Sequence, residues 1–166
     1  PFLTCRSVLL NKEERPENFP LFGREEILNR LEQRLEALKK GYRQNMGLVG
    51  PRFIGKTSLL VRFLKKMAGD PEVISIYIPL VDTDFDGFVE RWLGGLLESF
   101  LTSRGISFPE EFQLVVKIAR AYIPRTLERM REAKKHAFQK RIALAFRELL
   151  SLTATLHEET GKKILL

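Results

Sequence analysis

The chain has 166 residues, of which 44% are apolar and 30% charged, and its net charge is +7. This length suffices for one domain with a buried core, and the composition is typical of a globular protein. The longest apolar runs span only a few residues, which excludes a transmembrane helix, and we therefore expect no membrane partner. Since the single cysteine excludes an intrachain disulfide and the N-terminus lacks a signal-peptide pattern, we expect a cytoplasmic protein.

The first predicted helix follows residue 23. Residues 1–18 are mostly polar and contain proline, so we expect an irregular lead-in there. From Arg24 onward, acidic residues come first and Gly41 ends the segment, as is usual for a helix. Its inward face is predicted from apolar residues three or four apart: Ile27, Leu28, Leu31, Leu35 and Leu38. We assign residues 19–166 to one domain, and this helix is its first predicted element.

The most specific motif of the chain follows, a complete GxxxxGKT phosphate-binding loop formed by Gly50, Pro51, Arg52, Phe53, Ile54, Gly55, Lys56 and Thr57. Glycines allow the loop amides to point at phosphates, and the next helix offers its positive end. Residues 47–49 are an apolar run that predicts a buried strand, and the apolar spacing after Thr57 predicts a helix that ends at Gly69.

Beyond the loop, residues 73–80 predict a second strand, and Asp82 or Asp84 is expected to cap the next helix. The buried face of that helix is predicted from its spaced apolar residues: Phe85, Phe88, Val89, Trp92, Leu93, Leu96, Leu97 and Phe100. Residues 108–160 read as helical throughout, starting near Pro109 and interrupted at Pro124 and near His136, and Gly161 precedes a buried strand at 164–166.

These elements predict an α/β fold with a parallel sheet flanked by helices and a largely helical C-terminal half. Within the domain, residues 107–160 are a helical insertion or extension. His136 and His157 occur without ligand-spaced companions, so we expect exposed helix histidines rather than a metal site.

Nucleotide hydrolysis also needs acidic residues near the phosphates. Asp82 is one candidate, but Pro79 fits a central strand poorly, and 82–84 reads better as a turn and helix cap. The better candidate strand begins at Ile164, and acids following it would lie past Leu166. We therefore expect a nucleotide-binding domain that is truncated before those acids.

The positive charge is concentrated in one helical segment. Residues 117–148 contain ten basic and three acidic residues, so this segment carries +7 and the rest of the chain sums to zero. Such clustering can mark a nucleic-acid surface or a site for an acidic protein, but a solvated helix face explains it as well. We favour the solvated face, since no aromatic platform is interleaved with the basic residues.

Three stretches resemble the archaeal-type ATPase family of the signal-transduction (STAND) ATPases, which are relatives of the AAA+ class. Residues 22–28 are similar to the family's F-x-GRE-x-E-L box, and residues 50–60 are similar to its GPR-R-x-GKTSLL loop, except that Phe53 replaces a frequent arginine. Residues 161–166 are similar to the start of its Walker B strand. The resemblance implies a nucleotide-dependent switch that forms oligomers, with the adenine close to Leu21, Phe22, Gly23 and Arg24.

The leading hypothesis is therefore an ATP-binding core that uses Mg²⁺. Lys56 is the one residue to which we assign a catalytic role, since it would neutralise phosphate charge. Thr57 would bind the metal and Ser58 would contact the α-phosphate. We expect an ATPase in the complete protein and ATP binding without efficient hydrolysis in this segment. The alternatives are a DNA-associated ATPase module that uses the basic helices and a nucleotide-locked scaffold without turnover.

Overall fold

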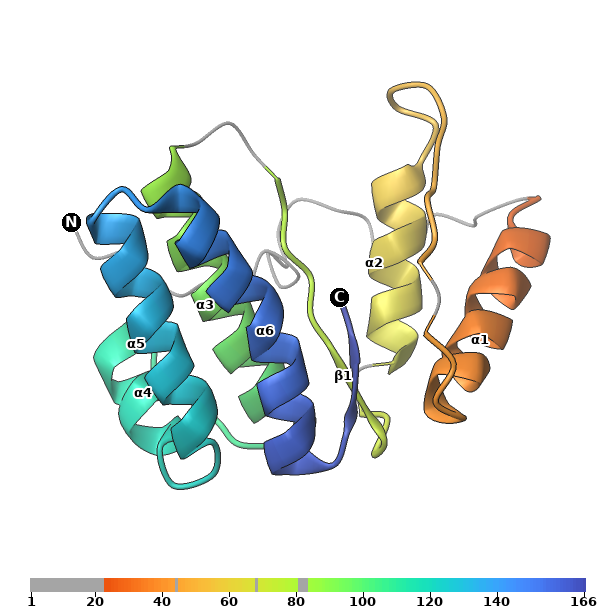
Figure 1. Ribbon diagram of the computed structural model, residues 1–166. Helices are drawn as coiled ribbons and strands as arrows, with labels where there is room; N and C mark the ends of the chain where they lie inside the picture. Colours follow the sequence, from red (N-terminus) through yellow and green to blue (C-terminus); the bar gives the residue numbers. More distant parts are fainter. Residues whose placement is uncertain (1–22, 44, 68, 81–83) are drawn as a thin grey trace.

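The computed structural model describes residues 23–43, 45–67, 69–80 and 84–166. Within these ranges it contains helices and two short strands (Figure 1): α1 (Glu25–Lys39), α2 (Lys56–Met67), β1 (Val73–Ser75), α3 (Phe85–Ser103), α4 (Phe112–Ala119), α5 (Pro124–Phe138), α6 (Ile142–Thr160) and β2 (Lys163–Leu165). The expected lead-in at 1–18 and the alternative cap Asp82 lie outside the described residues. No helix in the described ranges is long and apolar enough to cross a membrane.

The strands form a parallel pair in which Val73 faces Lys163, Ile74 faces Ile164 and Ser75 faces Leu165. Hydrogen bonds extend the pairing at both ends, from Lys163 N to Glu72 O (2.8 Å) and from Ile76 N to Leu165 O (2.7 Å). Both strands run toward the end of the molecule where the loop before α2 lies (Figure 1). Strands far apart in the sequence thus meet beside that loop.

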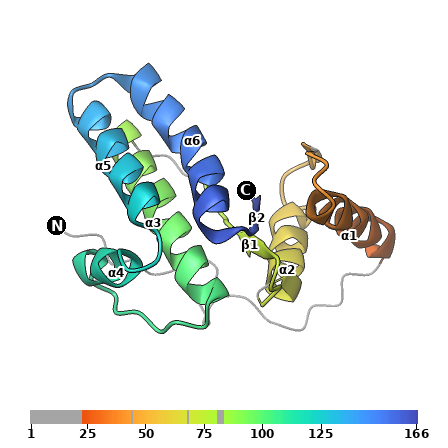
Figure 2. The same ribbon diagram turned by 60° about the horizontal axis from the view of Figure 1, so that its bottom comes forward.

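The sheet separates two hydrophobic cores, because consecutive strand residues point to opposite faces. Ile74 and Ile164 join a large core with α3, α4, α5 and α6, whereas Val73 and Leu165 join a smaller core with α1 and α2. Figure 2 shows the four later helices on one side of the strands and α1 and α2 on the other. The result is a layered α/β arrangement with helices on both faces of a parallel sheet.

Local sequence signals set most helix boundaries. Asp84 caps α3 by accepting a hydrogen bond from Gly87 N (2.8 Å), which confirms one of the two expected caps. Gly161 ends α6 with a left-handed φ of 71°, a conformation that favours glycine. The expected inward residues of α3 from Val89 to Phe100 are buried, whereas Phe85 and Phe88 are half-buried.

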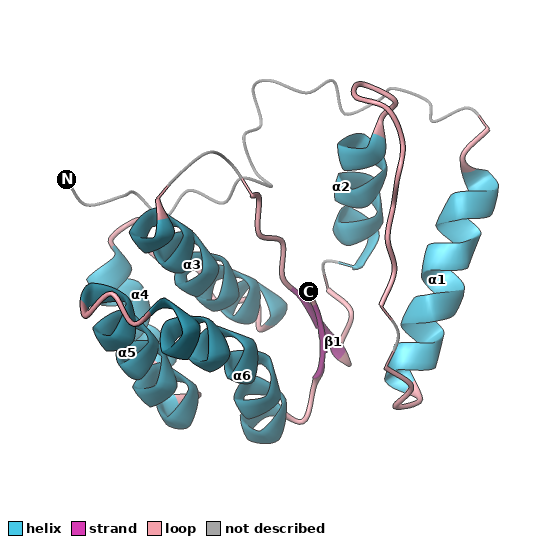
Figure 3. Ribbon diagram, turned by 45° about the horizontal axis from the view of Figure 1, so that its top comes forward, coloured by secondary structure: helices cyan, strands magenta, loops and turns pink. Residues whose placement is uncertain are grey.

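Several expectations about strands were wrong. Residues 47–49 run as coil rather than as a strand (Figure 3), and the Val49 side chain is 96% exposed. The second strand covers only Val73–Ser75 instead of 73–80, because its partner β2 is equally short and Pro79 lacks an amide donor. The strand β2 is half-buried rather than buried. A strand requires a neighbouring backbone, and the described residues supply one only for these three positions.

The helical region is interrupted as expected, at 120–123 directly before Pro124 and at 139–141 shortly after His136. Its first helix, however, begins at Phe112 rather than near Pro109. The two histidines are half-buried rather than exposed, because α5 and α6 pack closely along their length. His157 Nδ1 lies 2.7 Å from Lys162 O, a contact that ties the end of α6 to β2.

The N-terminus of α5 is capped by a carboxylate from α6. Pro124, the first residue of α5, has no amide hydrogen, and Glu159 accepts hydrogen bonds from the next two amides, Arg125 N (2.7 Å) and Thr126 N (2.8 Å). It also accepts one from the buried Thr126 hydroxyl (2.6 Å). The carboxylate accepts hydrogen bonds from two amides that would otherwise lack partners, and its negative charge interacts favourably with the positive end of the helix dipole.

We expect Glu159→Gln to lower the free energy of unfolding by about 1–2 kcal/mol, because the neutral amide cannot accept all three bonds. The control is Glu158→Gln, whose exposed ion pair with Arg125 is expected to contribute less than about 1 kcal/mol. Urea unfolding of both variants measures the difference. Equal destabilisation by the two substitutions would contradict the capping role.

A second contact joins α1 to the turn after α2. Lys39 Nζ lies 2.7 Å from Asp70 Oδ2, and Glu72 N donates to Asp70 Oδ1 (2.9 Å). Burial by itself would raise the pKa of Asp70, but the hydrogen bonds from Lys39 and from the Glu72 amide outweigh it and hold this pKa below its usual value. The charged form of Asp70 is therefore favoured in the folded protein.

A lowered pKa in the folded state stabilises the fold above the unfolded-state pKa, and this contribution is lost as the pH falls through the folded-state value. We expect Asp70→Asn to melt at a lower temperature than wild type at pH 7, and the difference to shrink below about pH 4. Glu36→Gln is the control, because Glu36 also pairs with Lys39 (3.2 Å) but is largely exposed. A difference in melting temperature that is constant from pH 7 to pH 3 would contradict this role of Asp70.

Candidate functional site

The GxxxxGKT loop connects the coil at 45–50 to the start of α2, at the end of the sheet toward which both strands run (Figure 1). Its turn passes through two residues with positive φ, Phe53 (64°) and Gly55 (88°). The Gly55 conformation is one that L side chains rarely adopt. Gly50 lies close to the opposite limb of the loop, so a Cβ added there would approach Ile54 Cγ2 to 3.3 Å. The geometry thus favours glycine at both fixed positions of the motif, at Gly55 because of its backbone conformation and at Gly50 because of the close contact.

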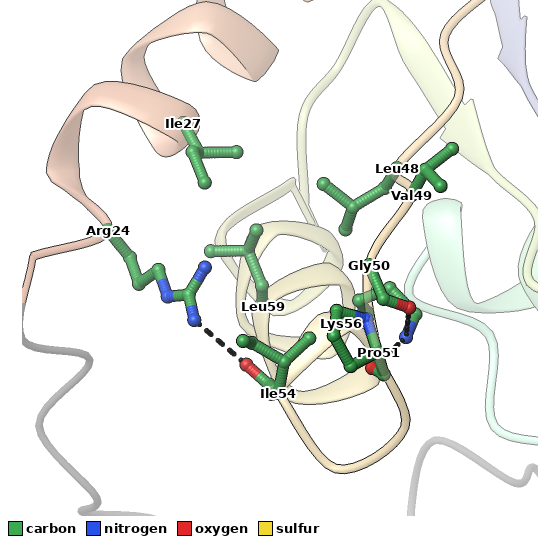
Figure 4. Close-up of a pocket in the computed structure, with 10 residues that line it drawn as sticks. Arg24, Ile27, Leu48, Val49, Gly50, Pro51, Ile54, Lys56 and Leu59 are labelled. Carbon is green, nitrogen blue, oxygen red and sulfur yellow. Dashed lines mark hydrogen bonds between the residues drawn. The ribbon is translucent and has the colours of Figure 1, made fainter.

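Lys56 folds back over the loop. Its Nζ donates to Gly50 O (2.8 Å) and to Pro51 O (2.6 Å), as Figure 4 shows. These carbonyls are neutral, so an anionic oxygen in the loop would attract the ammonium more strongly than they do. The lysine is therefore placed where it can exchange main-chain acceptors for an anion.

Arg24 approaches the same loop from the start of α1. Its Nη2 donates to Ile54 O at 2.9 Å, across thirty residues of sequence (Figure 4). Its own carbonyl accepts a hydrogen bond from Leu28 N (3.0 Å), so Arg24 also belongs to the first turn of α1. The residue thus connects the helix and the loop directly.

A pocket of about 170 Å³ lies between α1, the loop and α2 (Figure 4). It is lined by Arg24, Ile27, Leu48, Val49, Gly50, Pro51, Ile54, Gly55, Lys56 and Leu59. Two of these side chains are cationic and none is acidic, while most of the others are aliphatic. The volume is below the roughly 300–1,000 Å³ of typical ligand pockets, so the pocket is large enough for only part of a typical small-molecule ligand.

The N-terminus of α2 faces outward with unpaired amides. In the described part of the chain, the first amide of α2 with a main-chain acceptor is that of Leu59, which donates to Gly55 O (2.9 Å). The preceding amides of Lys56, Thr57 and Ser58 have no main-chain acceptor there. Such a helix end, next to a lysine, is a favourable position for phosphate oxygens.

Of the remaining expected site residues, some are exposed on the surface and two lie outside the residues that the structure describes. The exposed ones are Arg52, Phe53, Thr57 and Ser58, and none of them lines the pocket. Gly23 is exposed with φ 67° and precedes Arg24 directly. Leu21 and Phe22 lie outside the described residues, so their expected place near an adenine stays a prediction.

Sequence reasoning missed the aliphatic wall of the pocket. Ile27 and Leu48 come from segments before the loop, and Leu59 comes from α2, so their meeting depends on how α1 packs against α2. The helical periodicity of α1 and α2 indicated inward-facing residues but could not indicate which of them border a pocket. Arg24 was expected near a base, but its hydrogen bond to Ile54 O could not be predicted from the sequence, because it depends on how α1 packs against the loop.

More than half of the basic residues at 117–148 form ion pairs within the protein. Lys134 pairs with Glu90 of α3 (3.9 Å), Lys140 with Asp86 of α3 (2.6 Å), and Arg129 with Glu148 of α6 (3.1 Å). Further pairs on the same two helices use Arg125, Arg131 and Lys135. Six of the ten basic residues thus have acidic partners, which favours the solvated face over a polyanion surface.

Comparison with known proteins identifies a family for this chain. Residues 20–160 match the family described as AAA ATPase domain. No curated protein and no solved structure matches the chain. The match covers most of the sequence and includes α1, the loop and every later helix. From the loop with its cationic pocket and from this match, the chain belongs to the AAA ATPase domain family, and its fold is that of a P-loop nucleotide-binding ATPase core.

Proposed function

We propose that this chain is the ATP-binding core of a cytoplasmic, nucleotide-dependent switch of the archaeal-type STAND branch. The observation that carries the proposal is the pocket, where Lys56 and Arg24 lie beside the GxxxxGKT loop and no described lining residue is acidic. Phosphates are the anions that such a loop and helix end hold best.

The residues at the loop fit a Mg²⁺-bound nucleotide by their donor chemistry. The main-chain amides of the loop and of the first turn of α2, except at Pro51, which has no amide hydrogen, would hold phosphate oxygens, with Ser58 near the α-phosphate. Lys56 would leave Gly50 O and Pro51 O to neutralise phosphate charge. Thr57 is exposed at the first turn of α2 and would supply a hydroxyl ligand to Mg²⁺. The aliphatic residues Ile27, Leu48 and Leu59 would contact the nucleoside.

We further propose that this segment binds ATP without efficient hydrolysis. Turnover needs a carboxylate to order the metal shell and the attacking water, and the described lining of the pocket supplies none. In this proposal the loop acts as a sensor of bound nucleotide, and its state is passed to α1 through Arg24.

The test is calorimetric titration of Mg·ATP and Mg·GTP into the chain, with release of inorganic phosphate measured in parallel. We expect saturable ATP binding that needs Mg²⁺, weaker GTP binding and little phosphate release. A folded chain that binds neither nucleotide would refute the proposed function. Rapid phosphate release would refute the proposal of slow turnover and leave nucleotide binding in place.

A further inference from the structure

The two limbs of the loop are each held by one cationic side chain. Lys56 bonds to the carbonyls of Gly50 and Pro51 on the first limb, and Arg24 bonds to the carbonyl of Ile54 on the second. Lys56 belongs to the motif itself. Arg24 comes from a separate helix, so its bond reports how α1 is placed against the loop.

The Ile54 carbonyl bears on phosphate binding through the next amide. A peptide unit is planar, so the C=O of Ile54 and the N–H of Gly55 are fixed to each other and point in opposite directions. Gly55 has a φ of 88°, and glycine moves between conformations at little steric cost, so the residue itself does not hold this peptide plane in place. A hydrogen bond to Ile54 O therefore also sets the direction of the Gly55 N–H.

From this geometry we propose that Arg24 is a positioning residue for the phosphate-binding loop: its guanidinium holds the Ile54–Gly55 peptide plane and thereby orients an amide that binds phosphate. This inference rests on the proposed function and differs from a contact between Arg24 and the base. It also gives α1 a role at the site, because a shift of α1 that broke the bond would release the loop.

The competing explanations make different predictions for a ligand that has no base. We would measure the affinities of Mg·ATP and of inorganic tripolyphosphate for wild type, Arg24→Ala and Arg24→Lys, by competition with a fluorescent ATP analogue. Arg30→Ala is the matched control, because Arg30 lies on α1 with its guanidinium on Glu26 (2.6 Å) and does not line the pocket. Melting temperatures show that each variant is folded.

We expect Arg24→Ala to weaken both ligands by the same factor, about tenfold, as suits the loss of one hydrogen bond from a charged donor. Arg24→Lys retains the charge and a donor, so we expect it to recover part of this loss equally for both ligands. Arg30→Ala should match wild type. Should Arg24→Ala fail to fold, the affinities of the two ligands for Arg24→Lys still distinguish a positioning role from a contact with the base.

Three results would overturn the inference while leaving the proposed function intact. Arg24→Ala could bind both ligands as wild type does, it could lose ATP affinity alone, which would indicate contact with the nucleoside, or wild type could bind ATP but not tripolyphosphate. A wild-type chain that is folded and binds neither ligand would instead refute the proposed function, and this inference with it.

Discussion

Replacing Lys56 with alanine is expected to weaken binding of Mg·ATP by about 100-fold, since a charged donor to phosphate is worth roughly 3 kcal/mol. In the structure the Lys56 ammonium lies against Gly50 O and Pro51 O, on the loop that would surround the phosphates. Both carbonyls would become accessible to water in the variant, so we expect little change in melting temperature. Calorimetric titration measures the affinity.

The control for this substitution is Lys66→Ala on the same helix. Lys66 pairs with Glu32 of α1 (2.6 Å) at the far end of α2 and does not line the pocket. The Lys66→Ala substitution removes the same charge from the chain as Lys56→Ala, so any general effect of net charge on nucleotide affinity appears in both variants. Equal affinities of Lys56→Ala and wild type would show that the loop is not the binding site.

The largest expected loss of stability follows from truncation in the large core. Leu149 of α6 is 0% exposed, and we expect Leu149→Ala to lower the free energy of unfolding by about 2–5 kcal/mol, because it removes buried apolar area and leaves a cavity. For a domain of this size, that loss corresponds to a melting temperature lower by roughly 5–15 °C. Thermal unfolding followed by circular dichroism provides the measurement.

The adjacent residue supplies the control. Leu150 is 49% exposed on the same helix, so Leu150→Ala makes the same chemical change with the same effect on helix propensity. We expect it to cost less than about 1 kcal/mol, because little of its side chain leaves a packed environment. Similar losses in the two variants would mean that α6 packs through a different face.

The parts of the fold that sequence predicted well depend on neighbouring residues. The loop, the helix that follows it, the Asp84 cap and the Gly161 stop are all set within a few positions of chain, and the structure has all four. Helical periodicity likewise placed Leu31 and Leu35 on the buried face of α1. Short-range steric and hydrogen-bonding preferences suffice for such features.

The parts that sequence predicted poorly depend on distant partners. The residues at 47–49 have the composition of a strand, but a strand forms only where another backbone offers hydrogen bonds. The carboxylate of Glu159 lies thirty-three residues from the Thr126 amide that it caps, and Arg24 lies thirty residues from Ile54. No local pattern encodes such pairs, because they result from how whole helices pack.

The two cores on either face of the sheet also differ in size. Among the described residues, the core beneath the loop has six buried members from α1, α2 and β1, whereas the core on the other face is several times larger. Regions with less buried apolar surface open at a lower free-energy cost than the molecule as a whole. A ligand at 100 times its dissociation constant stabilises the state that it binds by about 2.7 kcal/mol. Nucleotide at the loop would therefore act mainly on the smaller unit, raising the cost of its opening, while the α3–α6 bundle would stay folded with or without it.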